Sequence, residues 1–130
     1  MVTKDKVLNT GFFRLARNES LKSDFHIRVG AVIVRKGTPI SVGKNSPQKT
    51  HPELSKFSKL KTVHAEVDAV IGIERHLIKG ACMYVYREKR SGELGIAKPC
   101  PMCTAILRNY GVKKVYYTTE SGYSITKLGK

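Results

Sequence analysis

The sequence predicts an α/β fold in which helices cover a mixed β-sheet, and three observations lead to this prediction. Apolar residues recur at helical spacing in some segments and run continuously in others, as in amphipathic helices and buried strands. Glycine and proline separate these segments along the chain. The resulting order of helix, hairpin, helix, strand, helix, strand requires crossover helices between the later strands.

The length and the cysteine count place the chain in a broad class. We expect residues 1–130 to form a single domain, because this length suits one hydrophobic core. No apolar run approaches the ~20 residues that span a bilayer, and the first residues lack the apolar core of a secretory signal. Three cysteines are too few for a disulfide framework. We therefore expect a cytoplasmic protein without membrane contact.

The first half of the chain is expected to hold a helix and a hairpin. Apolar residues recur at helical spacing over residues 3–18, which predicts the first helix. The apolar run Val29–Val34 predicts a buried strand. The turn residues Lys36–Pro39 lead into a second short strand, Ile40–Gly43. Residues 44–63, with two prolines and five lysines, predict a long loop.

The second half is expected to alternate helices with strands. The expected segments are a helix over His64–His76, a strand over Ala81–Tyr86, a basic loop over residues 87–98, a helix over Pro99–Tyr110 and a strand over Val112–Thr119. Gly80 and Gly111 follow the two helices and are expected to end them.

The charge balance indicates a phosphate-bearing partner. The chain has 24 lysines and arginines against 10 aspartates and glutamates, so its formal net charge is +14. Such a field attracts phosphate groups, whether on a free nucleotide or on a polymer. The alternative is that the lysines only keep a small protein in solution. A nucleotide substrate is expected, and single-stranded nucleic acid is a second possible partner.

The segment KPCPMCTAI, residues 98–106, holds two of the three cysteines in the spacing Cys-x-x-Cys. In a helix that begins near Pro99–Pro101, Cys100 and Cys103 lie on one face of the first turn. Proline is well suited to the first helical positions, and the helix dipole favours thiolate over thiol there. This arrangement suits either a metal ion or a disulfide.

Two alternatives to a catalytic metal site remain open at this point. A Cys-Pro-Met-Cys pair between a strand and a helix is typical of a redox protein. A structural zinc ribbon needs another Cys-x-x-Cys or His pair, and the third cysteine, Cys82, lies alone in an apolar strand.

The upstream segment Val63-His64-Ala65-Glu66 offers a third ligand at the start of another helix. One imidazole and two thiolates form a neutral three-ligand zinc site, whose fourth position stays open for water. Glu66 is close enough to His64 along the chain to act as a base on that water. Neither alternative explains this segment.

Together, the two segments resemble the cytidine/deoxycytidylate deaminase superfamily of zinc enzymes, whose signature is H-x-E…P-C-x-x-C. The matching residues are His64-Ala65-Glu66 and Pro99-Cys100-Pro101-Met102-Cys103. Further similarity lies in Gly30–Val34, Gly43–Ser46 and Gly111–Tyr117, so that it covers roughly residues 25–119. The two motifs are specific for the superfamily but not for the substrate within it.

The resemblance implies a fold and a set of site residues. The implied fold is a three-layer α/β/α structure around a mixed five-stranded sheet, with the fifth strand near Tyr123–Thr126, and relatives are usually oligomers. The implied zinc ligands are His64, Cys100 and Cys103. Glu66 is the implied proton shuttle, and Asn45 and Ala65 are implied to contact the substrate, Asn45 at the sugar.

The implied reaction is hydrolytic deamination, with cytosine in a free nucleotide such as dCMP or CMP as the leading substrate. A polynucleotide base deaminase acting on cytosine or adenine is the main alternative, because a charge of +14 exceeds what one phosphate requires. A guanine or other free-base or nucleoside deaminase and a non-catalytic zinc-stabilised binding module are the remaining ones. The basic loops 44–61 and 87–98 are expected to rim the pocket in every case.

Overall fold

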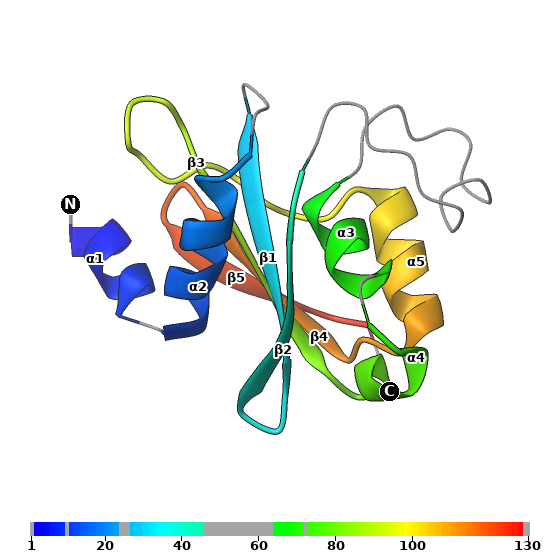
Figure 1. Ribbon diagram of the computed structural model, residues 1–130. Coiled ribbons are helices and arrows are strands. Elements are labelled where there is room, and N and C mark those ends of the chain that lie inside the picture. Colours follow the sequence, from blue (N-terminus) through cyan, green and yellow to red (C-terminus); the bar gives the residue numbers. More distant parts are fainter. Residues whose placement is uncertain (1, 10, 24–26, 46–63, 72, 129–130) are drawn as a thin grey trace.

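Five strands form one mixed sheet. The structure, a computed structural model, describes residues 2–9, 11–23, 27–45, 64–71 and 73–128. The strands are β1 (Arg28–Arg35), β2 (Thr38–Lys44), β3 (Cys82–Glu88), β4 (Lys114–Thr119) and β5 (Gly122–Lys127). Their order across the sheet is β2-β1-β3-β4-β5, with β3 and β4 parallel and the other neighbours antiparallel (Figure 1). The expected mixed five-stranded sheet is confirmed.

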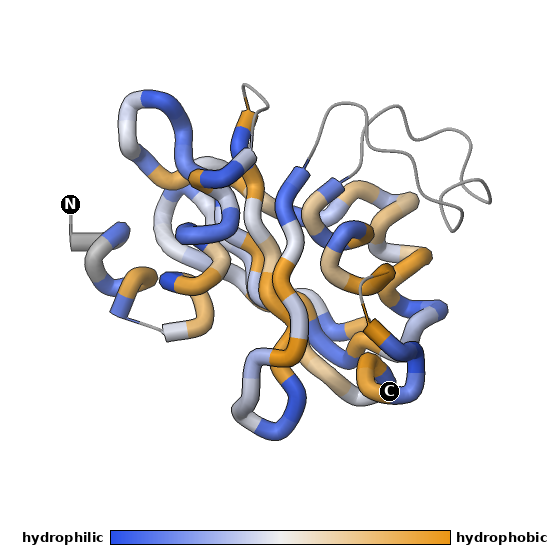
Figure 2. Tube along the Cα trace, in the orientation of Figure 1, coloured by the Kyte–Doolittle hydropathy of each residue, from blue (hydrophilic) through white to orange (hydrophobic). Residues whose placement is uncertain are grey.

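Helices cover both faces of this sheet. They are α1 (Val2–Leu8), α2 (Gly11–Ser20), α3 (Ala65–Ile71), α4 (Arg75–Ile78) and α5 (Pro101–Tyr110). α1 and α2 lie on one face, and α3 and α5 lie on the other (Figure 1). One apolar core fills each interface, and the hydrophobic residues follow the central strands (Figure 2). The expected three-layer α/β/α fold is confirmed.

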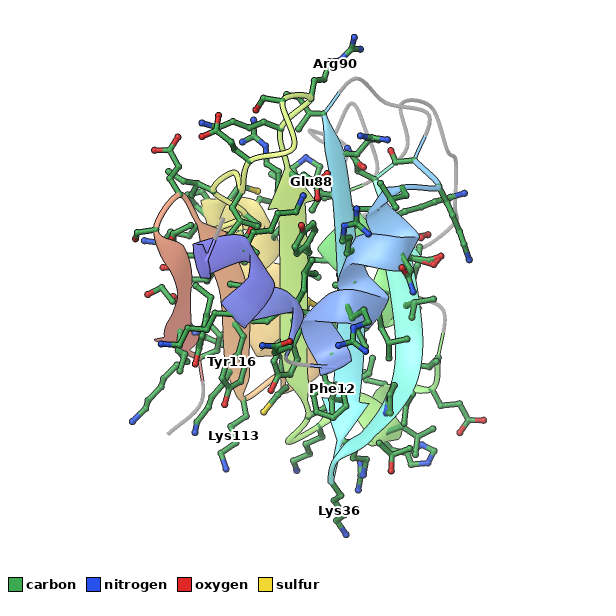
Figure 3. All side chains as sticks on the ribbon, turned by 90° about the vertical axis from the view of Figure 1, so that its left-hand side faces the viewer. Phe12, Lys36, Glu88, Arg90, Lys113 and Tyr116 are labelled. Carbon is green, nitrogen blue, oxygen red and sulfur yellow. The ribbon has the colours of Figure 1, made fainter. Side chains whose placement is uncertain are left out.

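The core on the α1/α2 face is rich in aromatic rings. Phe13 from α2 meets Tyr84 of β3 edge to face, with ring centroids 5.1 Å apart. Tyr84 stacks on Tyr116 of β4 with centroids 4.4 Å apart (Figure 3). Such pairs stabilise a core by about 0.5–1.5 kcal/mol beyond the area that they bury. This layer therefore provides a packed backing for the central strands.

The expected hairpin is present, but its turn is shorter than the sequence indicates. Lys36 and Gly37 have φ angles of 50° and 78°, so the chain reverses over two left-handed residues. A two-residue turn of this kind matches the twist of the strands that it joins. Thr38 and Pro39 pair with β1 and thus belong to β2 rather than to the turn.

The prediction of a single helix over residues 3–18 is wrong, because the structure has two helices there. α1 ends at Leu8 and α2 begins at Gly11. The Nε and Nη2 atoms of Arg14 donate hydrogen bonds to the Leu8 carbonyl oxygen at 3.2 and 3.0 Å. This side chain supplies a partner that a terminal helix carbonyl otherwise lacks, so the break is stabilised.

The helix expected over His64–His76 is also divided, into α3 and α4. The sequence has Gly72 between them, and glycine lowers helix stability by about 1 kcal/mol relative to alanine. α3 packs closely on the sheet because Gly43 of β2 leaves no room for a Cβ atom against Ala65 and Ala69. The start of α3 is therefore held firmly against the sheet.

The remaining expectations concern the C-terminal half and the loops. The strand predicted over Tyr123–Thr126 is confirmed as part of β5, and α5 ends at Gly111, which has a φ angle of 91°. Arg87, expected in a basic loop, lies within β3 instead. Residues 46–63 of the predicted long loop lie outside the described residues. Among the described residues, no helix is long and apolar enough to cross a membrane.

Candidate active site

Two helix N-termini on the same face of the sheet carry the motif residues. His64 directly precedes α3, and its carbonyl oxygen accepts a hydrogen bond from the Asp68 amide at 2.9 Å. Cys100 is the N-cap of α5, and its sulfur accepts a hydrogen bond from the Cys103 amide at 3.3 Å. Pro101 at the first helical position needs no such partner. Local sequence therefore places both segments at helix starts.

The fold brings these segments together. The ligand atoms of His64, Cys100 and Cys103 all lie within 4.8 Å of one another, and no other group of this kind occurs among the described residues. Nδ1 of His64 lies 3.0 Å from Sγ of Cys103 and 3.7 Å from Sγ of Cys100. Ligand atoms around one tetrahedral zinc ion, at about 2.1 Å for nitrogen and 2.3 Å for sulfur, lie roughly 3.5–3.8 Å apart. The cluster fits a zinc site.

The protonation chemistry of the cluster also suits a cation. Burial lowers the pKa of His64, so its imidazole is neutral and can act as a ligand. Burial, together with the charge of nearby Glu66, raises the pKa of the Cys103 thiol. A thiolate in this place therefore needs a positive partner, which a bound metal ion supplies. A redox cysteine pair alone would leave His64 without a role.

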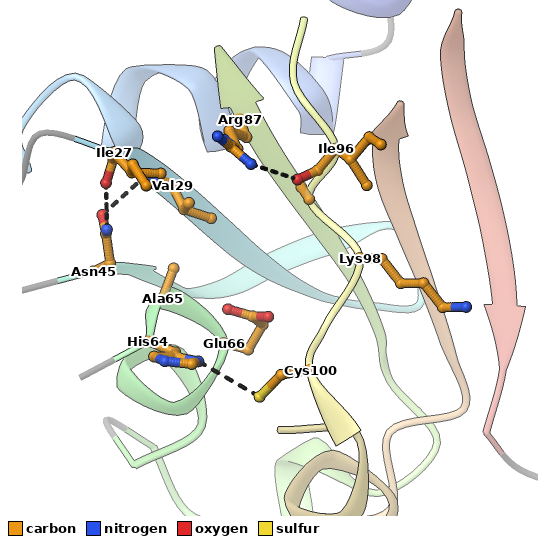
Figure 4. A pocket seen from close by; sticks show the side chains of 11 residues that line it. Ile27, Val29, Asn45, His64, Ala65, Glu66, Arg87, Ile96, Lys98 and Cys100 are labelled. Atoms are coloured by element: carbon orange, nitrogen blue, oxygen red, sulfur yellow. Dashed lines mark hydrogen bonds between the residues drawn. The ribbon is translucent and has the colours of Figure 1, made fainter. Parts of the chain in front are cut away.

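Glu66 lies beside the cluster with its carboxylate directed into a cavity (Figure 4). The residue is only 5% exposed. Burial raises the pKa of this carboxyl to about 7, and no basic side chain of the described residues counters that effect. Most buried carboxylates in proteins are paired with a cation, so one without a basic partner among the described residues, next to ligand atoms, indicates a chemical role.

The cavity has a volume of about 220 Å³, and one side of it is apolar. Ile27, Val29 and Ile96 form this side, and His64, Glu66 and Cys100 lie opposite (Figure 4). Ile27 is 38% exposed and Ile96 is 52% exposed, so both present apolar surface at the cavity. A flat ring can therefore lie between apolar side chains and the ligand cluster.

Two cations, Arg87 and Lys98, also line the cavity. Nη1 of Arg87 donates a hydrogen bond to the Ile96 carbonyl oxygen at 3.3 Å. A Cβ atom on Gly95 would lie 3.1 Å from Cγ, Cδ and Nε of Arg87, so this glycine leaves space for the arginine stem. Arg87 is thereby oriented at the wall. The sequence predicted that the basic residues of 87–98 rim the pocket, but no local pattern indicated that Ile27 or Ile96 would line it.

Asn45 and Ala65, expected to contact the substrate, both line the cavity. Oδ1 of Asn45 accepts a hydrogen bond from the Val29 amide at 2.9 Å, and Nδ2 donates one to the Ile27 carbonyl oxygen. Asn45 therefore holds the start of β1 in place. Its amide nitrogen carries a second hydrogen for another partner.

Comparison with known proteins places the chain in a family. The family model for the cytidine and deoxycytidylate deaminase zinc-binding region matches residues 7–119. An uncharacterized deaminase from the luxG 3′ region of Aliivibrio fischeri is 28% identical over 125 residues, covering 92% of this chain and 78% of the relative.

Solved structures agree with this match. The dCMP deaminase of the cyanophage S-TIM5 superposes with a TM-score of 0.63 at 25% identity, covering 88% of this chain and 84% of that one. A cytidine deaminase from Burkholderia pseudomallei shares the fold with a TM-score of 0.67, at 17% identity and 91% coverage of both chains. This chain therefore belongs to the cytidine and deoxycytidylate deaminase family of zinc-binding hydrolytic deaminases.

Proposed function

We propose that the protein deaminates the cytosine base of a nucleotide such as dCMP or CMP. The observation that carries this proposal is one cavity whose wall includes two residues of the three-ligand metal cluster, a buried carboxylate and two cations. The metal cluster and the carboxylate suit hydrolysis at a ring carbon. The cations suit a phosphate group on the same small molecule.

The chemistry is assigned to four residues. His64, Cys100 and Cys103 hold the zinc ion, which when bound supplies Lewis acidity that activates water. Glu66 takes a proton from the attacking water and transfers it to the ring nitrogen. Once the water oxygen is bonded to the ring carbon, Glu66 takes the second proton from that oxygen and transfers it to the amine. The carbon–nitrogen bond then breaks, so that ammonia leaves and a keto group remains. Proton transfer by a positioned side chain typically contributes a rate factor of about 10²–10⁴.

The substrate contacts follow from the walls of the cavity. Arg87 is oriented by Gly95 and Ile96, and so is the leading partner for the phosphate. The remaining hydrogen of the Asn45 amide is assigned to the sugar, and Ala65 forms part of the wall against the base. The cyanophage dCMP deaminase has also been solved with dCMP and dUMP, which supports a nucleotide substrate here.

The test is a substrate panel that measures ammonia release from dCMP, CMP, deoxycytidine, cytidine, adenosine and guanine. We expect dCMP or CMP to exceed the matching nucleoside in kcat/KM by about tenfold, the size of one charge-assisted contact to phosphate. Arg87→Gln should remove most of this preference. Arg90→Gln is the control, because Arg90 is an exposed cation in the following loop and does not line the cavity.

Two outcomes would contradict the proposal. Equal turnover of cytidine and CMP, unchanged in Arg87→Gln, would assign a nucleoside substrate. Turnover of adenosine or guanine, without turnover of any cytosine compound, would assign a different base.

A further inference from the structure

A second hollow lies next to the catalytic cavity, over the start and the outer side of α5. Its volume is about 520 Å³. The residues that line this α5 groove are Lys98, Pro99, Pro101, Thr104, Ala105 and Arg108. Lys98 lines the groove and the cavity alike. The two hollows are therefore neighbours that share one cation.

The groove is built from one stripe of α5. Positions 101, 104, 105 and 108 follow the i, i+3, i+4, i+7 pattern, so their side chains lie along one side of the helix. Pro101, Ala105 and Arg108 are exposed. The lining combines small apolar surface, a hydroxyl and two cations, and it includes no carboxylate among the described residues. This chemistry suits a sugar and a phosphate rather than an acidic or a purely apolar ligand.

The position of Lys98 connects the groove to the reacting base. Its side chain extends away from Glu66, toward β4 and β5 (Figure 4). Its charge also contributes to lowering the pKa of Tyr117, after hydrogen bonds from Ser124 and Thr126. A phosphate bound at Lys98 would therefore lie where the cavity and the groove meet, on the side away from Glu66.

We propose that the substrate extends beyond one nucleotide, and that the nucleotide flanking the target base in a single-stranded polynucleotide lies in the α5 groove between Lys98 and Arg108. This inference rests on the proposed function, since the same hydrolysis occurs at the base in the cavity. The polymer phosphates match the two cations of the groove and the +14 charge of the chain.

A second copy of the chain fits this groove less well. A twofold interface would place the same patch of both copies face to face. Each copy would then bring the same two cations and no described carboxylate, and like charges across an interface oppose association. A phosphate backbone meets no such repulsion.

The experiment measures binding of a single-stranded oligonucleotide of about nine residues, with one central cytosine, as DNA and as RNA. Fluorescence anisotropy gives Kd over a range of salt concentrations. Arg108→Gln removes one groove cation. Ala105→Glu leaves both cations in place and adds a carboxylate to the groove. Lys113→Gln is the matched control, because Lys113 is an exposed cation just before β4 that does not line the groove.

We expect Arg108→Gln to weaken oligonucleotide binding about tenfold and to reduce the slope of log K against log salt by about 0.7, the value for one phosphate contact on a single strand. Ala105→Glu should weaken binding at least as much. Lys113→Gln should change Kd by less than about twofold, since it reduces only the long-range electrostatic field of the chain. Sequencing of treated oligonucleotides should show deamination at the central cytosine.

Three results would overturn the inference. Equal losses in Arg108→Gln and Lys113→Gln would show attraction by net charge alone. A change of oligomeric state in Arg108→Gln, with oligonucleotide binding intact, would make the groove an interface between copies. Oligonucleotides that stay unedited while dCMP is deaminated would limit the substrate to free nucleotides and leave the proposed function standing. The proposed function itself fails if no cytosine compound of either kind is deaminated, or if the substrate panel assigns a nucleoside substrate or a different base.

Discussion

Two carboxylates, the buried Glu66 and the partly buried Glu88, lie on opposite faces of the sheet in contrasting surroundings. Glu66 faces the catalytic cavity, and burial raises its pKa to about 7. Glu88 lies at the end of β3 beneath α1 and α2 (Figure 3). Burial acts to raise the pKa of Glu88 as well, but hydrogen bonds from Tyr86, Lys4 and Arg17 outweigh it and lower the pKa. The two carboxyl groups differ in both burial and partners, because Glu66 is the more deeply buried and only Glu88 has cationic partners among the described residues.

The contacts of Glu88 show what those partners do. Its Oε1 atom lies 2.7 Å from the Tyr86 hydroxyl, 3.0 Å from Nζ of Lys4 and 3.2 Å from Nε of Arg17. These contacts join α1, α2 and β3. A partly buried carboxylate surrounded by donors stabilises the fold, whereas a fully buried one without a cationic partner nearby is suited to proton transfer.

The largest expected effect is that of removing a ligand from the metal cluster beside Glu66. No such cluster lies beside Glu88 among the described residues. Cys103→Ala should abolish deamination and reduce bound zinc, measured by elemental analysis, from about one equivalent to a small fraction, because two protein ligands hold zinc poorly. Cys82→Ala is the control, since Cys82 lies outside the cluster. Full zinc content in Cys103→Ala would contradict the ligand assignment.

Exchange of the two carboxylates for amides tests the comparison directly. Glu66→Gln should lower kcat by about 10²–10⁴ while zinc content stays the same, because it removes only the proton shuttle. Glu88→Gln should leave kcat within a few-fold of the wild type. A near-wild-type rate in Glu66→Gln would make Glu66 a structural residue.

The same pair of variants should show the opposite order in stability. Glu88→Gln should lower the free energy of unfolding by about 1–3 kcal/mol, because Lys4 and Arg17 lose their charged partner. Glu66→Gln should leave this free energy unchanged or raise it, because it removes a buried charge that has no cationic partner among the described residues. Urea denaturation followed by circular dichroism measures both. Equal destabilisation by the two variants would show that their surroundings do not differ as described.

Acid should remove the advantage that Glu88 provides. Its pKa in the folded chain lies below the unfolded value of about 4.3, so its stabilisation is fully present above that pH. It is lost as the pH falls through the lower, folded pKa. The difference in unfolding free energy between wild type and Glu88→Gln should therefore shrink below about pH 4. A difference that persists unchanged at low pH would contradict the ionic role.

The smallest expected effect concerns Lys4, which connects the Glu88 cluster to a loop near the cavity. Its Nζ atom also donates a hydrogen bond to the Gly92 carbonyl oxygen at 2.8 Å. Lys4→Met should raise KM about twofold to fivefold and speed hydrogen exchange over residues 89–95, because one loop anchor is lost. Lys6→Met is the control, as Lys6 is exposed on the same helix. Identical exchange in both variants would argue against this anchor.

The sequence by itself was sufficient for the chemistry of the metal cluster. His64 and the Cys100–Cys103 pair occupy helix starts, and the signals for a helix start are local: proline, a capping side chain and the following apolar period. Strand positions were predictable for the same reason, because β1 contains an apolar run and β4 is rich in β-branched and aromatic residues. Local pattern was insufficient at the helix breaks, where Arg14 contacts the Leu8 carbonyl.

Only the tertiary structure decided which charges surround each carboxylate. Lys4 and Arg17 meet Glu88 across most of the chain, and Arg87 reaches the cavity because Gly95 leaves room for its side chain. No spacing in the sequence encodes these encounters. A pKa depends on burial and on every charge within a few ångströms, and both are set when distant segments pack together. The sequence therefore indicated the groups to which the proposed reaction is assigned, and the fold determined their surroundings.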